Sequence, residues 1–153
     1  MKITGIKFEQ PSLRMISSVL AETTEQWYVE WRRDGRLRKL WVPAGYVWDG
    51  ASVPRFAWSI IGITPFGAGD ATSLAHDALY RAMGGRKPEA WKGCTLTDDQ
   101  GRTVTVSRNE ADRLMQAMFR QSGYNRVQSA MAYQAVNLFG RKHWGGPIPA
   151  LRG

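Results

Sequence analysis

The chain has 153 residues, the size of one ordinary domain, and its 43% hydrophobic and 22% charged residues are typical of a globular protein. No apolar run approaches the roughly 18 residues that cross a bilayer, and the first residues lack the apolar segment of a secretory signal. The single cysteine, Cys94, excludes an internal disulfide framework and a zinc site built on several thiolates, and two histidines leave little room for a histidine-rich metal site.

The charge balance favours an anionic partner, because 21 lysines and arginines against 13 acidic residues give a net charge of +8. The densest basic group, at 32–39, flanks an Asp34-Gly35 turn, and two interpretations stay open. It is a solvated hairpin tip, or it binds nucleic acid with Trp31 and Trp41 stacking on bases. We expect most of the seven tryptophans to pack in the core.

The first half of the chain predicts β structure. Residues 26–31 and 37–42 alternate apolar and polar side chains around Asp34-Gly35, which is a strong hairpin signal. Pro43 ends the second strand, residues 46–48 form a short strand, and Ser52 with Pro54 predicts the start of a helix.

The second half predicts three main helices and one small hairpin. Asp70 is the expected N-cap of the first helix, and Ser107 with Glu110 forms an S-x-x-E capping box for the second. The ranges are helices over 71–83, 107–121 and 125–139, hairpin strands near 93–97 and 102–106, and an irregular tail over 141–153. The sequence therefore predicts one α+β domain, with a small antiparallel sheet from the N-terminal half packed on about three helices.

The candidate chemistry centres on residues 75–80, AHDALY. Helical spacing places His76, Tyr80 and Met83 on one face that faces the interior, with Asp77 at its border. Asp112 borders the apolar stripe of its own helix, so it reaches His76 and fixes its tautomer if the two helices pack through these stripes. A buried imidazole beside a carboxylate is what a general base requires.

Structural alternatives stand beside this hypothesis. His76 is then a core residue whose hydrogen bonds are satisfied, and Asp112 is a solvated carboxylate in the first turn of a helix. Asp49, at a turn, is a candidate ligand for a hard cation, and Ser52 is a weaker candidate nucleophile that no G-x-S-x-G motif supports. No glycine motif for binding phosphate or dinucleotides is present.

Three motifs in this order, VPAGYVWDGASVPR (42–55), HDALY (76–80) and EADR (110–113), resemble a family found largely in bacteriophage genomes and catalogued as domain of unknown function 1353. The resemblance covers roughly residues 40–140. It implies a phage or prophage origin, often among tail and other late genes, and it brings no established activity.

A second similarity is local. Secreted calcium-dependent phospholipases A carry a helical His-Asp-x-x-Tyr, and His76, Asp77, Tyr80 and Asp112 follow in the same order. This resemblance implies that His76 activates water, Asp77 binds calcium and Asp112 orients the histidine. The chain departs from those enzymes by lacking their disulfides and a convincing glycine-rich calcium loop.

Three functions follow as hypotheses. The first is a hydrolase of an ester or amide, such as an envelope lipid, with His76, Asp112 and Tyr80 catalytic and with Asp77 and Asp49 holding a divalent cation, calcium first and zinc second. The second is a structural tail or tail-tip protein that contacts other virion proteins. The third is a basic module that binds nucleic acid, a host protein or an anionic membrane surface. All three place the protein in the virion or the host cytoplasm.

Overall fold

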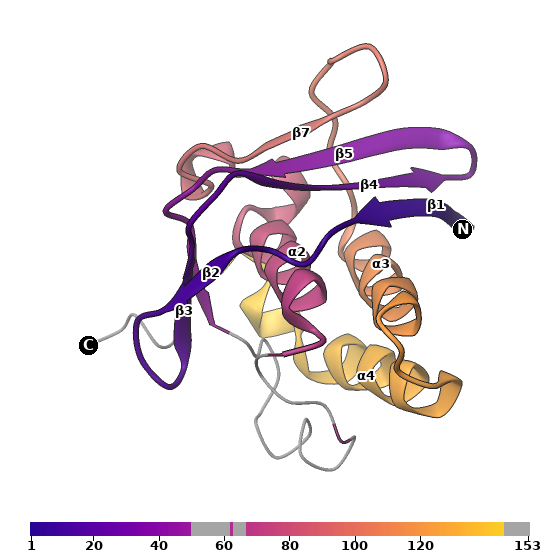
Figure 1. Cartoon of the computed structure of the whole chain (residues 1–153). Helices are drawn as coiled ribbons and strands as arrows, with labels where there is room; N and C mark the ends of the chain where they lie inside the picture. Colours follow the sequence, from indigo (N-terminus) through magenta and orange to yellow (C-terminus); the bar gives the residue numbers. More distant parts are fainter. Residues whose placement is uncertain (50–61, 63–66, 146–153) are drawn as a thin grey trace.

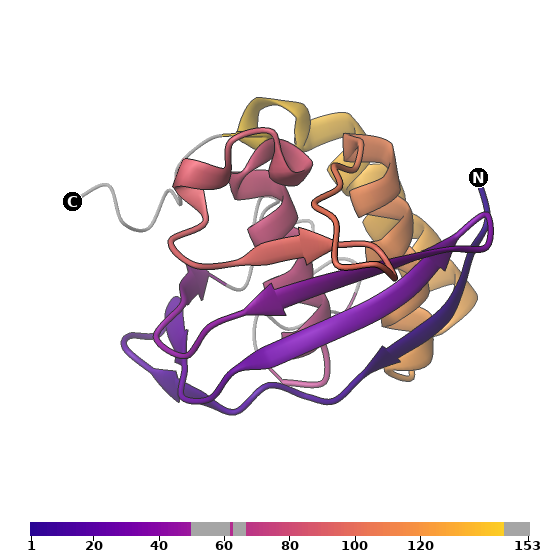
Figure 2. The same cartoon turned by 90° about the horizontal axis from the view of Figure 1, so that it is seen from above.

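The computed structural model describes residues 1–49, 62 and 67–145. Two antiparallel sheets and, within these residues, three α-helices make up the fold, so the predicted α+β class is confirmed. Figures 1 and 2 show the larger sheet lying across one side of the helices. None of the described helices is long and apolar enough to cross a membrane.

The larger sheet is built around the predicted hairpin. Strands β4 (Trp27–Arg33) and β5 (Arg36–Val42) pair in register from Trp27↔Val42 to Arg33↔Arg36. Asp34 and Gly35 both have positive φ angles, 50° and 82°, as a two-residue hairpin turn requires. The strands β1 (Ile3–Phe8) and β7 (Thr95–Thr97) complete the order β1-β4-β5-β7.

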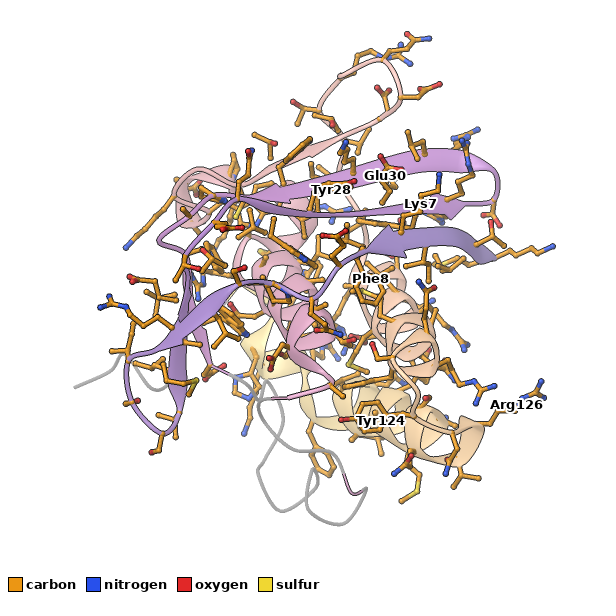
Figure 3. All side chains as sticks on the ribbon, viewed as in Figure 1. Lys7, Phe8, Tyr28, Glu30, Tyr124 and Arg126 are labelled. Atoms are coloured by element: carbon orange, nitrogen blue, oxygen red, sulfur yellow. The ribbon has the colours of Figure 1, made fainter. Side chains whose placement is uncertain are left out.

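Strand β4 alternates between the core and the solvent. Val29 and Trp31 are fully buried, and Leu40 faces Val29 from β5. Tyr28 and Glu30 lie on the outer face of the sheet (Figure 3). The alternative in which Trp31 stacks on bases is therefore wrong, because its ring belongs to the core.

The smaller sheet has the order β2-β3-β6, with β2 (Leu13–Met15), β3 (Leu20–Thr23) and β6 (Val47–Asp49). The short strand predicted over 46–48 is confirmed with a shift of one residue. No strand is predicted before residue 26, because β1 is only partly buried and β2 and β3 are very short. The helix start predicted at Ser52 lies outside the described residues, as does the tail from 146.

Helix α2 (Asp70–Arg81) crosses the middle of the molecule (Figure 1). Gly69 is its N-cap, so the expectation for Asp70 is wrong by one position; the Asp70 carboxylate instead accepts a hydrogen bond from the Gly67 N–H. The helix ends before Met83, which has a φ of 49° and does not continue the face of His76.

Helix α3 (Arg108–Gln121) begins as predicted, with the Ser107 hydroxyl accepting from the Glu110 N–H. The second half of the expected capping box is wrong. The Glu110 carboxylate is fully buried and accepts from Trp31 Nε1 at 3.1 Å and Arg33 Nη1 at 3.0 Å, with Arg38 at 3.7 Å. Two basic residues of the hairpin therefore neutralise an interior charge and are not a free solvated tip.

Helix α4 (Arg126–Phe139) packs against α3, and its capping box is formed by Asn125 and Gln128. The described residues also form three short 3-10 helices. Two lie between α2 and β7, η1 (Met83–Gly85) and η2 (Pro88–Ala90), and η3 (Arg141–His143) follows α4. The second predicted hairpin is only half formed. Residues after β7 return by a single bridge, Thr97↔Thr103, and no second strand forms over 102–106.

One glycine sets how closely α2 approaches the start of α3. Gly84 has a φ of 65°, and a Cβ built on it would lie 2.0 Å from the Val106 carbonyl oxygen. The Val106 N–H donates to the Gly84 carbonyl, so the two backbones are in direct contact. This close contact fixes the spacing of the two helices that carry the candidate site.

Candidate active site

The facing sides of α2 and α3 bring three predicted site residues together. His76 Nε2 lies 3.0 Å from Asp112 Oδ1, and the Tyr80 hydroxyl donates to the same oxygen at 2.6 Å. All three are buried, with exposed fractions of 3%, 0% and 2% for His76, Asp112 and Tyr80. The predicted meeting of His76 and Asp112 is confirmed, and the alternative of a solvated Asp112 is wrong.

The second oxygen of Asp112 faces a cation. Its Oδ2 lies 3.6 Å from Arg108 Nη1 and makes no hydrogen bond among the described residues. Burial and the neighbouring Asp112 charge raise the pKa of Tyr80 well above its usual value, so Tyr80 stays a hydrogen-bond donor. The carboxylate therefore has one oxygen that orients two donors and another that lies beside a guanidinium.

Aromatic packing holds the Tyr80 ring in place. The ring centroid lies 4.1 Å from that of His76, and Trp144 meets Tyr80 edge-on at 5.1 Å. Gly140 leaves room for the hydroxyl, because a Cβ there would lie 2.9 Å from it. Tyr80 therefore positions Asp112 and is itself fixed from both sides.

This arrangement selects a tautomer of His76. When the neutral ring carries its hydrogen on Nε2, it donates to Asp112, and Nδ1 is the nitrogen that can take up a proton. A carboxylate in this place also stabilises the imidazolium that forms after proton uptake. The cluster is therefore chemically suited to general-base catalysis.

Asp77 belongs to a second buried cluster. Its Oδ2 accepts from Arg81 Nη2 at 2.9 Å, and Arg81 also donates to the Val47 carbonyl at 2.8 Å. The Tyr46 hydroxyl lies 3.5 Å from the same oxygen. Burial raises the pKa of Asp77 to about 7, Arg81 opposes this shift, and the negative charge of Asp49 adds to it.

The two predicted cation ligands, Asp49 and Asp77, are near enough to interact electrostatically, but Arg81 supplies the positive charge beside Asp77. Within residues 1–49, 62 and 67–145, no three or more histidine, cysteine or acidic side chains converge as a metal site. As arranged, these side chains do not fit a divalent cation unless Arg81 moves. The cation stays a prediction, and no catalytic step is derived through it.

The lone cysteine does not add a nucleophile to the site. Cys94 is buried, and burial raises the pKa of its thiol to about 12, so it is not a thiolate at neutral pH. Ser52 lies outside the described residues.

Sequence reasoning missed three residues that shape the two clusters: Arg81, Arg108 and Trp144. The i, i+4 spacing of Asp77 with Arg81 and of Arg108 with Asp112 is a signal that could have found the two arginines. No local pattern marks Trp144, because its contact with Tyr80 spans 64 residues and depends on how the segment after α4 returns to α2.

The comparisons with known proteins agree with the family resemblance. No curated protein and no solved structure matches the chain. The family model described as a protein of unknown function, DUF1353, matches residues 24–136, which include the β4–β5 hairpin and all of α2 and α3. The match begins earlier than the roughly 40–140 expected from the motifs. Since it covers more than half of the chain and the whole of the His76 cluster, the chain belongs to the DUF1353 family.

Proposed function

We propose that this protein is a hydrolase of ester or amide bonds in which His76 is the general base. The observation that carries the proposal is the 3.0 Å contact between His76 Nε2 and Asp112 Oδ1 inside a buried cluster. Low solvent exposure strengthens such a contact, because little water competes for the carboxylate.

In the proposed reaction, His76 Nδ1 takes a proton from a water molecule, whose oxygen attacks the carbonyl carbon of the substrate. Asp112 stabilises the resulting imidazolium, and Tyr80 and Arg108 keep Asp112 oriented. The imidazolium then returns the proton to the leaving oxygen or nitrogen as the carbon–heteroatom bond breaks. Tyr80 and Arg108 are positioning residues in this scheme.

The test measures hydrolysis of p-nitrophenyl esters of short and long chain length, and of a fluorogenic phospholipid, by the wild type and His76→Gln. We expect a loss of about 10²-fold to 10⁴-fold in kcat, the usual contribution of a positioned general base. His143→Gln, at the other histidine, is the matched control and keeps full activity. Equal activity of His76→Gln and wild type on every hydrolysed substrate would overturn the proposal.

A structural role is the second candidate, and one observation favours it. His76, Tyr80 and Asp112 are each 3% exposed or less, as in polar networks that only specify packing. If the protein is a phage tail component, as the family resemblance implies, it is present in purified particles at a fixed copy number. In that case His76→Gln lowers the unfolding midpoint strongly, and the wild type hydrolyses none of the substrates.

A further inference from the structure

A groove of about 420 Å³ lies between the solvent face of α3, the start of α4 and strand β1, and no residue of the His76 cluster lines it. Arg113, Arg120 and Arg126 line it, together with apolar side chains that include Ile3 and Ala117. Figure 3 shows Arg126 at the outer edge of the molecule, at the beginning of α4. None of the described residues that line the groove is acidic.

Two of these guanidinium groups are held by uncharged neighbours. Arg113 stacks over the Tyr133 ring at 4.2 Å, and Arg120 Nη1 donates to the Tyr124 carbonyl at 3.4 Å. Within the described part of the chain, none of the three arginines forms an ion pair. A guanidinium has five N–H donors, so most of this donor capacity remains for an anionic ligand.

An exposed apolar stripe runs along α4 beside this groove. Val127, Met131 and Leu138 are 67%, 41% and 69% exposed, and helical spacing places them within about 40° of one another. The stripe is opposite the buried residues of α4, so nothing in the described fold covers it.

The charge around the stripe selects its partner. No acidic residue follows Asp112 in the sequence, whereas six lysines and arginines do. A second copy of the chain would bring like charges together on this face. A nucleic acid would match the arginines but leave the aliphatic stripe in water. A bilayer with anionic phospholipids matches both, since it offers phosphate groups beside an apolar interior.

We propose that the arginine groove and the α4 stripe together form a docking surface for an anionic phospholipid membrane. The arginines bind the lipid phosphates, and Val127, Met131 and Leu138 enter the boundary between headgroups and acyl chains. The surface does not include His76, so this inference stands independently of the proposed hydrolase.

The test is sedimentation with vesicles of phosphatidylcholine alone or mixed with phosphatidylglycerol. We expect the wild type to pellet with the mixed vesicles only, and binding to weaken as salt is added. Arg120→Gln with Arg126→Gln is expected to lower the partition coefficient about fivefold per arginine removed. Arg32→Gln with Arg36→Gln, at two exposed residues of the β4–β5 hairpin, is the charge-matched control and changes the partition coefficient far less.

Leu138→Ser tests the stripe, with Ile16→Ser as the control at a similarly apolar residue that is 49% exposed. Weaker vesicle binding by Leu138→Ser alone supports the proposal. The proposal would be overturned if the groove variant and the hairpin control lost the same factor in partition coefficient. It would also be overturned if the wild type bound equally to both kinds of vesicle. If single-stranded DNA displaces the wild type from the vesicles but does not bind the Arg120→Gln, Arg126→Gln variant, the groove is a nucleic-acid site and the proposal is overturned. Conversion of a wild-type dimer to a monomer by Leu138→Ser would assign the stripe to self-association.

Discussion

Two buried clusters extend from adjacent residues of α2, and they differ in kind. His76 faces α3 and meets the Asp112 carboxylate, which also accepts a hydrogen bond from Tyr80. Asp77 projects about 100° further round the helix, toward the smaller sheet, and meets the guanidinium of Arg81 from its own helix. Both carboxylates, Asp112 and Asp77, are buried, and burial raises the pKa of Asp77 to about 7.

The difference shows that burial alone does not decide what a carboxylate does. Asp112 contacts His76 and Tyr80 through one oxygen and has Arg108 near the other, so three side chains fix its position. Asp77 has a single strong partner and a like charge nearby in Asp49. The first cluster is therefore built to orient an imidazole, and the second is a pair whose charge depends on pH.

Removing the shared acceptor of the first cluster is expected to have the largest effect. Asp112→Ala leaves His76 and Tyr80 as buried donors without their acceptor, and it leaves Arg108 without its anion. We expect a loss of about 5 kcal/mol in the free energy of unfolding, measured by urea denaturation at neutral pH.

Asp112→Asn keeps an acceptor in the same place and is the matched variant. Its free energy of unfolding is expected to fall by about 2 kcal/mol. Its hydrolytic activity is expected to be largely lost, because the amide cannot stabilise an imidazolium. If Asp112→Ala costs less than 1 kcal/mol, the cluster does not contribute to folding in the way that its geometry indicates.

The second cluster predicts a pH dependence. The pKa of Asp77 lies above its unfolded value of 3.8, so the protonated carboxyl favours the folded state. This contribution to stability is complete below about pH 4, is lost as the pH rises to about 7, and stays constant above that. The free energy of unfolding of the wild type, measured by urea denaturation, is therefore expected to fall by a few kcal/mol between these pH values. In Asp77→Asn this fall is expected to be absent.

Asp98→Asn is the control for this slope. Asp98 is half-buried, and hydrogen bonds from the backbone N–H groups of Arg102 and Gln100 lower its pKa, so its contribution has the opposite sign and lies at lower pH. An Asp77→Asn variant whose unfolding free energy keeps the wild-type slope from pH 4 to pH 7 would show that Asp77 is ionised throughout.

Tyr80→Phe is expected to have a smaller effect, because it removes one hydrogen bond and leaves the ring packing intact. We expect about 1 kcal/mol of destabilisation. If Tyr80 positions Asp112, kcat falls several-fold while KM changes little, and the pH profile of kcat shifts with it. An unchanged kcat with the same loss of stability would restrict Tyr80 to packing.

The sequence predicted the hairpin, the three described helices and the His76–Asp112 contact because each rests on local periodicity or turn chemistry. Helical spacing placed both residues on buried faces, and two buried faces on neighbouring helices tend to pack together. Glu110 shows the limit of this reasoning. Its spacing from Ser107 predicts a capping box, but the carboxylate instead binds Trp31 and Arg33, which are more than 75 residues away. The tertiary ion pair of Glu110 is formed in place of the local capping interaction. No feature of the local sequence distinguishes a glutamate that completes a capping box from one that forms a distant ion pair.

Local sequence likewise does not show that Asp77, a predicted cation ligand, is already paired with Arg81. The smallest expected effect is therefore that of added metal ions on the melting temperature. Arg81 already supplies the positive charge at Asp77, and a cation would have to displace it. We therefore expect calcium, zinc and a chelator to leave the melting temperature of the wild type unchanged, because only a ligand that binds the folded state raises it. A rise with calcium that Asp77→Asn abolishes would contradict this and establish the cation site that the sequence predicts. In that case Arg81 moves away when the ion binds, and Arg81→Gln then binds calcium more tightly than the wild type.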